Sequence, residues 1–198
     1  MNNRLMKDEA MNQAMERTDR WRGSPWRMAM WGAAALLLAL PAAAMLVTDE
    51  MQWSVGDFIL VATMLAAGCV TIELAARSSR NVAYSLGSGV AVASAFLLIL
   101  VNGAVGFLGS EDNPANLVFF GVIAIAILAS VLAGFRAAGM SRAMFAAALA
   151  QLLVGVAAIP AGWASPGSDG LYEVALGTGL FCTLWLVAAG LFRKAARD

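Results

Sequence analysis

The stretch NLVFFGVIAIAILASVLAGF, residues 116–135, decides the class of this protein because it contains no charged side chain. A helix needs roughly 20 apolar residues to cross a bilayer core about 30 Å thick. The stretch therefore predicts a transmembrane helix. Five other apolar runs of similar length surround it, at residues 26–47, 57–77, 81–108, 141–159 and 171–192. The sequence predicts an all-α polytopic membrane bundle of six transmembrane helices.

The composition supports this class. Hydrophobic residues make up 61% of the chain and charged residues only 13%, whereas soluble domains contain about 25% charged residues. Six spans use most of the 198 residues, so we expect one transmembrane domain over residues 26–192. A polar tail, residues 1–25, precedes it, and a short basic tail, residues 193–198, follows it. The first tail carries a loose apolar stripe, which fits either an amphipathic helix on the membrane surface or a frayed end.

The basic residues all fall on one side of the predicted spans. Basic residues accumulate in cytoplasmic loops, so this partition predicts that both termini are cytoplasmic. The 13 basic residues lie in the two tails and in the second and fourth loops: Arg4, Lys7, Arg17, Arg20, Arg22, Arg27, Arg77, Arg80, Arg136, Arg142, Arg193, Lys194 and Arg197.

The opposite side of the bundle is acidic. It carries Asp49, Glu50, Asp57, Glu111, Asp112, Asp169 and Glu173, and no basic residue. We interpret the basic side as a contact with anionic lipid rather than a nucleic-acid site.

Three predicted helices each place small or polar residues at three- and four-residue spacing, which puts them on one helix face. Small residues let helices approach closely, and buried amides form hydrogen bonds across helices. We therefore expect these three faces to meet in the bundle interior. The sets are Thr63, Ala66, Val70, Glu73 and Arg77; Tyr84, Ser88, Ala91, Ala95, Leu98 and Asn102; and Met144, Ala148, Gln151, Gly155 and Ala158.

Glu73 is the only carboxylate well inside an apolar run. One interpretation is a proton or cation carrier. The other is an ion pair with Arg77, one turn further on and close to the basic side. Its position one turn from the basic loop favours the ion pair.

Ser88, Asn102 and Gln151 are the other candidate interior polar residues. Gln151 lies near the middle of its span, and Asn102 lies nearer the acidic side. Both could contact a solute, but a hydrogen bond between helices is the favoured interpretation.

The loop string GSEDNPAN, residues 109–116, is the most distinctive polar segment. Asn113 followed by Pro114 is typical of a helix start, and Glu111 and Asp112 suit the positive end of a helix. We expect capping to explain most of this string. An external ligand or cation site at Glu111, Asp112 and Asn113 is the alternative.

This string, the apolar helix after it and the segment SRAMF, residues 141–145, resemble a group of uncharacterised bacterial inner-membrane proteins. The resemblance covers residues 57–158. It implies six spans and a bacterial inner membrane, and it implies no catalytic residue.

Missing residue types exclude several classes of site. The chain has no His, which removes His-ligated haem, His-containing zinc sites and a Ser–His hydrolase. Its lysines lie only in the tails, and its two cysteines, Cys69 and Cys182, lie inside apolar runs as small hydrophobic residues. We therefore expect no enzyme activity, no cofactor and no resident metal.

Three functional hypotheses remain. The first is an accessory or assembly subunit of a membrane complex, or a packing homo-oligomer, with a protein partner and the lipid bilayer around it. The second is a small-solute or ion transporter that uses the Glu73, Asn102 and Gln151 face. The third is a membrane sensor that acts through the N-terminal tail.

Overall fold

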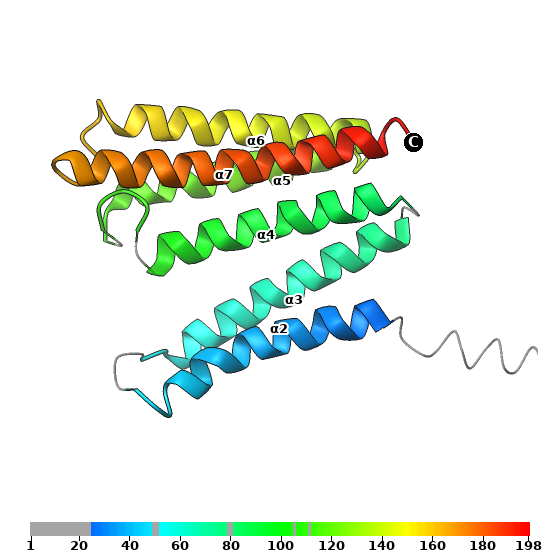
Figure 1. Ribbon diagram of the computed structural model, residues 1–198, viewed down its shortest axis with the longest axis horizontal. Coiled ribbons are helices and arrows are strands. Elements are labelled where there is room, and N and C mark those ends of the chain that lie inside the picture. Colours follow the sequence, from blue (N-terminus) through cyan, green and yellow to red (C-terminus); the bar gives the residue numbers. More distant parts are fainter. Residues whose placement is uncertain (1–24, 49–51, 79–80, 105, 111) are drawn as a thin grey trace, which may run out of the picture. The chain divides into compact units, whose positions relative to one another are not determined.

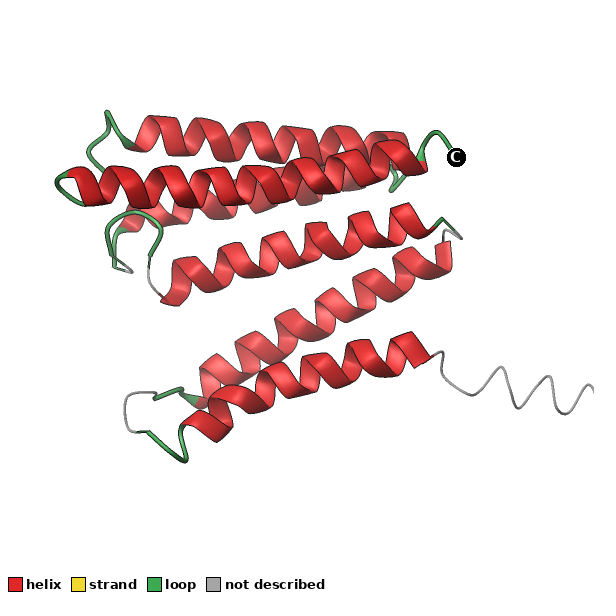
Figure 2. Ribbon diagram, in the orientation of Figure 1, coloured by secondary structure: helices red, strands yellow, loops and turns green. Residues whose placement is uncertain are grey.

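The computed structural model describes residues 25–48, 52–78, 81–104, 106–110 and 112–198, without the side chains of residues 77 and 78. All regular elements in these ranges are helical (Figures 1 and 2). Six helices within them are long and apolar enough to cross a membrane, which confirms the predicted fold class. They are α2 (Pro25–Ala44), α3 (Val55–Ser78), α4 (Val82–Ala104), α5 (Val118–Leu132) with the short 3-10 helix η1 (Pro114–Leu117) before it, α6 (Ala137–Ala158) and α7 (Ser168–Ala195).

The chain forms two compact units that divide within α3, after Thr63. The described part of the first unit contains α2 and the start of α3. The second unit contains the rest of α3 and the helices from α4 to α7.

A capping box begins α3 in the first unit. The backbone N–H and the hydroxyl of Ser54 donate to Asp57 Oδ2 over 2.7 and 2.8 Å, and the Asp57 N–H donates back to Ser54 Oγ over 3.3 Å. The rings of Trp53 and Phe58 meet edge to face at 5.3 Å, in the positions of a hydrophobic staple. Asp57, one of the acidic-side carboxylates, therefore fixes the start of a helix.

Helix α7 is the central element of the second unit. It packs along α6 on one side and α4 on the other, and α6 also packs against α5. The pair α6–α7 is antiparallel. Ser141 near the start of α6 donates to the Ala189 carbonyl over 2.9 Å, and Cys182 donates to the Ala148 carbonyl over 3.4 Å.

The pair α4–α7 is also antiparallel. Tyr84 in the first turn of α4 packs edge to face on Phe192, near the end of α7, at 5.1 Å. The Tyr84 hydroxyl also donates to the Phe135 carbonyl over 2.6 Å, which ties α4 to the turn after α5. The largest fully buried side chains of this unit are Trp185, Phe119, Phe181, Phe192, Leu98 and Leu108.

Two predicted boundaries are wrong. The third apolar run was expected to be helical through residue 108, but α4 ends at Ala104. Gly106 and Gly109 take positive φ angles of 74° and 80°, which favour glycine. Phe107 and Leu108, between them, are buried in the core without being helical. Both residues are hydrophobic because they are buried. Hydrophobicity alone does not distinguish a buried loop from the end of a transmembrane helix.

The second correction concerns residues 137–140, which were expected to connect two helices and instead form the first turn of α6. Gly134 and Phe135 both have φ angles of 56°. This left-handed pair reverses the chain within residues 133–136, so α6 begins earlier than expected.

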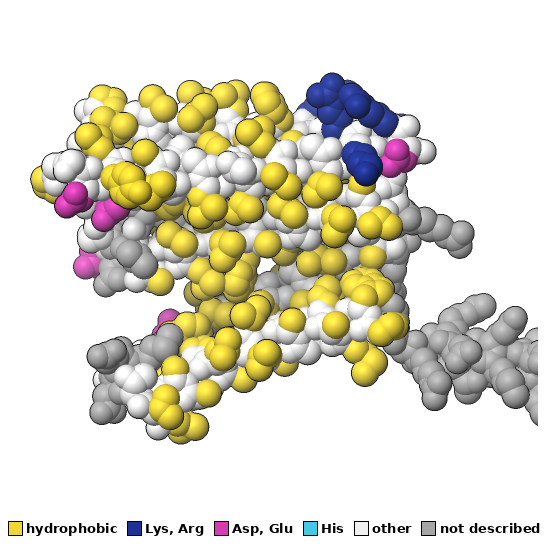
Figure 3. All heavy atoms as spheres, in the orientation of Figure 1, with side chains coloured by type: hydrophobic (Ala, Val, Ile, Leu, Met, Phe, Trp, Pro, Cys, Tyr) yellow, Lys and Arg dark blue, Asp and Glu magenta, His cyan; other side chains and the backbone are white. Residues whose placement is uncertain are grey.

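Charged side chains separate along α6 and α7. Lys and Arg atoms gather where α7 ends, beside one acidic side chain, and the other acidic atoms on this helix lie where it begins, with apolar side chains over the flanks between them (Figure 3). An exposed apolar flank between two charged ends suits a bundle that crosses a bilayer.

Candidate functional site

Two of the three predicted interior faces are buried. On α6, all five residues of the predicted face, Met144 to Ala158, are buried. On α4, Tyr84, Ser88, Leu98 and Asn102 are buried, and the alanines between them are half-buried.

The predicted face of α3 is wrong. Thr63 is exposed and Val70 is 46% exposed, while Val61, Cys69 and Ala75 are the buried residues of this helix. The Thr63 hydroxyl donates to the carbonyl of Ile59, one turn back in the same helix. It therefore needs no partner on another helix.

The faces of α4 and α6 both pack against α7. Helix α7 has an apolar buried face with one polar residue, Thr178, within it. This face comprises Gly170, Val174, Thr178, Phe181, Trp185, Ala188, Ala189 and Phe192.

Gln151 is fully buried between two contacts of α6 with α7. On one side is the Cys182–Ala148 hydrogen bond. On the other side is Gly155, where even a Cβ atom would overlap the Thr178 side chain. Among the described residues, neither Oε1 nor Nε2 of Gln151 has a hydrogen-bond partner.

Asn102 on α4 lies at about the same height along the bundle as Gln151 on α6. Gly87 of α4 touches Phe192 of α7, and 15 residues of helix, or about 22 Å, separate Gly87 from Asn102. The same length of α7 leads back from Phe192 to Gly177, beside Thr178. Asn102 Nδ2 donates to the Leu98 carbonyl over 2.7 Å, and its Oδ1 has no partner within the described chain.

We call Asn102, Gln151 and Thr178 the interior polar layer. The hydroxyl of Thr178 is buried and also lacks a partner among the residues described. A buried polar group without a hydrogen bond costs about 1–3 kcal/mol. The layer contains amide and hydroxyl groups and no titratable group, so it can hold a polar partner by hydrogen bonding but cannot itself carry a proton.

Sequence reasoning missed Thr178 and Trp185. The indole Nε1 of Trp185 is buried and unpaired within the described ranges. The two residues are seven positions apart, so they lie on one face of α7. The signal that could have found them is the polar Thr178 in line with the aromatic residues of that face.

Ser88 is buried, but its hydroxyl donates to the Tyr84 carbonyl over 3.0 Å. Its hydrogen-bonding capacity as a donor is thus used within α4, and it is not part of the layer.

Two asparagines hold the loop after α4. Asn116 Oδ1 accepts hydrogen bonds from the N–H groups of Phe107 and Leu108, and Asn116 Nδ2 donates to the Ser110 carbonyl over 2.7 Å. Asn113 Nδ2 donates to the carbonyls of Leu108 and Trp163. The loop is therefore fastened both to η1 and to the segment between α6 and α7.

The hydrogen bonds of Asn113 and Asn116 place Phe107 against α7. Its ring lies over Gly177, where a Cβ atom would overlap it. The ring centroid is 4.4 Å from that of Phe119 and 5.7 Å from that of Phe181. The loop therefore packs an aromatic cluster against α7, next to the interior polar layer.

The predicted helix cap at Asn113 is confirmed. Asn113 is the N-cap of η1, and its Oδ1 accepts from the Ala115 N–H over 3.0 Å. With both ends of its side chain engaged, Asn113 is not an available external ligand. Asp112 is exposed, and Glu111 lies outside the described residues. Within the described chain, no three His, Cys, Asp or Glu side chains converge on a possible metal site.

Glu73 is half-buried on α3 and takes part in an interaction. The side chain of Arg77 lies outside the described residues, so the predicted ion pair stays a prediction. Cys69 and Cys182 are both free thiols.

Comparison of the chain with protein-family models, curated proteins and solved structures finds no match.

Proposed function

We propose that this protein is a non-enzymatic subunit of the bacterial inner membrane that joins a protein partner, or a second copy of itself, through α2. Its six apolar helices make it an integral membrane protein. One observation carries the proposal: small residues occupy positions 32–35 of α2 and recur at positions 42–44.

The surface of α2 suits contact with another helix. Gly32 lies inside α2, where the lack of a side chain lets a second helix come close. Small residues follow Gly32, at positions 33–35, and recur at positions 42–44. Apolar helices have no hydrophobic driving force for association in lipid. Close packing at small residues is therefore a main source of affinity between helices in a membrane.

The absence of an enzymatic role is part of the proposal. It rests on the sequence, which has no His and keeps both lysines in its tails. Cytoplasmic termini are also proposed, from the one-sided distribution of Lys and Arg.

A photo-cross-linking experiment in native membranes tests the role of α2. A benzoylphenylalanine is placed at Leu36 on α2 or at Leu153 on α6, which are 64% and 60% exposed. We expect a protein adduct from position 36 and none from position 153. Two differently tagged copies of the chain separate a homo-oligomer from a foreign partner. A failure of position 36 to give any protein adduct would contradict the proposal.

A small-solute transporter is the second candidate, favoured by the unpaired amide of Gln151. Its test is a Gln151→Cys variant in a background with Cys69→Ser and Cys182→Ser. A transporter should let a charged methanethiosulfonate reagent reach this position from water. A dry packing interface should leave the thiol unlabelled, with Ser110→Cys on the exposed loop as the positive control.

The sensor hypothesis concerns residues 1–24, which lie outside the described residues. Deleting residues 1–20 tests it, because a sensor of this kind should then lose its cytoplasmic partner while the bundle stays in the membrane.

A further inference from the structure

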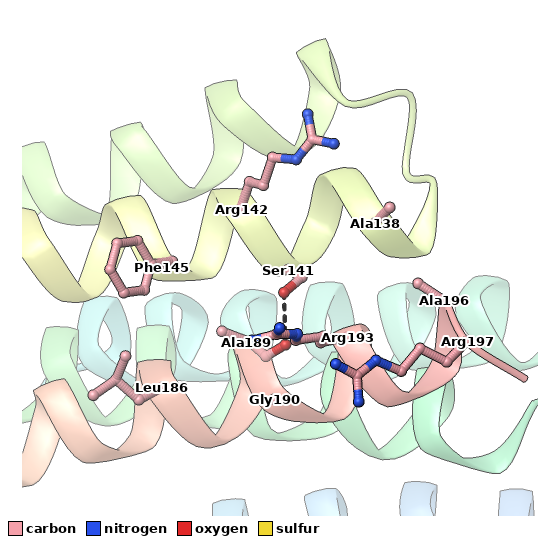
Figure 4. Close-up of a pocket in the computed structure, with 10 residues that line it drawn as sticks. All are labelled: Ala138, Ser141, Arg142, Phe145, Leu186, Ala189, Gly190, Arg193, Ala196 and Arg197. Carbon is pink, nitrogen blue, oxygen red and sulfur yellow. Dashed lines mark hydrogen bonds between the residues drawn. The ribbon is translucent and has the colours of Figure 1, made fainter.

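An open groove of about 550 Å³ lies between α6 and α7 at their basic end (Figure 4). We call it the basic groove. Its walls carry Arg142 and Phe145 from α6, Leu186 and Arg193 from α7, and Arg197 from the turn after α7. Its floor includes Gly190, where an added Cβ atom would meet nothing within 4 Å.

Helix periodicity builds this groove. Arg142 and Phe145 are three residues apart on α6, and Leu186 and Arg193 are seven apart on α7. These spacings align each pair along one helix face. Arg197 follows Arg193 by four residues, in the turn after α7. The hydrogen bond from Ser141 to the Ala189 carbonyl, drawn in Figure 4, holds the two walls together over 2.9 Å.

The charge of the groove is uncompensated within the described chain. Arg142, Arg193 and Arg197 are all exposed, and no described carboxylate pairs with any of them. The nearby Asp198 instead accepts a hydrogen bond from Asn81 over 3.5 Å and lines a separate hollow together with Lys194.

The groove changes from charged to apolar with depth. Leu186 lies seven residues before Arg193 on α7, about 10 Å further into the membrane, and Phe145 lies about one turn further in than Arg142 along α6. Phe145 and Leu186 are 59% and 47% exposed. A phospholipid has the same order, with a charged phosphate above an apolar chain.

We propose that the basic groove binds an anionic phospholipid. Arg193 and Arg197 hold its phosphate, since guanidinium groups donate two parallel hydrogen bonds to phosphate oxygens. An acyl chain lies along Phe145 and Leu186. Arg142, which points away from α7 in Figure 4, adds positive potential from the other wall. The site is independent of the proposed role of α2.

Native mass spectrometry of the full chain released from nanodiscs tests this site. The nanodiscs contain phosphatidylcholine with phosphatidylglycerol as the minor lipid. We expect retained phosphatidylglycerol on the wild type and a loss of about 10- to 30-fold in R193Q/R197Q, from about 1 kcal/mol per basic residue. The matched control Lys194→Gln, on the same turn but lining the other hollow, should lower retention by no more than about fivefold, the long-range effect of one basic residue near the surface.

A second variant fills the groove without removing charge. Gly190→Leu should lower phosphatidylglycerol retention while helicity and elution volume stay unchanged. Equal retention of phosphatidylcholine, or an equal loss in Lys194→Gln, would overturn the proposal. So would unchanged retention in Gly190→Leu. In lipid-free detergent, thermal stabilisation by inorganic phosphate that R193Q/R197Q abolishes would show a free-phosphate site instead.

Discussion

Asn116 Oδ1 accepts a hydrogen bond from the backbone N–H of Phe107 over 2.9 Å. This bond, and the matching one from Leu108 at 2.8 Å, fold the loop back so that Phe107 enters the core. The loop therefore depends on one buried amide from the next element along the chain.

Replacing Asn116 should loosen this loop. Asn116→Ala leaves the N–H groups of Phe107 and Leu108 and the Ser110 carbonyl without their partner, which should cost about 1–3 kcal/mol in the free energy of unfolding. Thermal unfolding in detergent measures the loss. Ser110→Ala, which keeps the carbonyl, is the control. Equal stability of Asn116→Ala and wild type would show that the hydrogen bonds of Asn116 do not hold the loop.

Gln151→Leu should not destabilise the protein. The buried amide of Gln151 lacks a partner within the described chain, so an apolar residue of similar volume removes a desolvation penalty of about 1–3 kcal/mol. The melting temperature should stay equal or rise. Gln151→Glu should lower it, because it places an ionisable group in the same site. A marked drop in Gln151→Leu would show that the amide has a functional or structural partner.

At Gly155, α6 lies so close to α7 that an added Cβ atom would overlap the Thr178 side chain. Gly155→Ala should destabilise the bundle by about 1–3 kcal/mol through overpacking against Thr178. Gly89→Ala is the matched control, since a Cβ atom there meets nothing within 4 Å. This control should be neutral or slightly stabilising.

A double-mutant cycle tests the same contact. Thr178→Ala removes the hydroxyl and the methyl group that the new Cβ would meet, so it should recover part of the stability lost in Gly155→Ala. Strictly additive effects of the two substitutions would show that the helices are not in contact there.

Fusion reporters test the proposed topology. With Lys and Arg on the cytoplasmic side, a fluorescent protein fused after Asp198 should fluoresce, and alkaline phosphatase fused after Trp163 should be active. The two reporters are then exchanged as a control, and both should fall silent. The reverse pattern would show that the termini lie outside.

The sequence predicts the local features of this fold well. Asn113 and Pro114 identify a helix start because a cap needs only residues close in the chain. Met144, Gln151 and Gly155 identify the buried face of α6 because small and polar residues collect where helices pack. Each of these signals is contained within one helix or one turn.

The wrong predictions for α3 and for the end of α4 share a physical cause. Thr63 and Val70 have the spacing of a buried helix face, but both are exposed. Phe107 was predicted to lie in a transmembrane helix, but it lies in a buried loop. In lipid, an apolar side chain is equally stable facing the bilayer or another helix, so hydrophobicity does not say which face is inside.

By itself, the sequence determined that six helices are long and apolar enough to cross a membrane, because helix length and charge depend only on the order of residues. Only the tertiary structure decided that α7 lies between α4 and α6, that Phe107 closes the bundle and that Arg193 and Arg197 share a groove with Phe145. These relationships depend on close packing between residues far apart in the chain, and such packing follows shape rather than hydrophobicity.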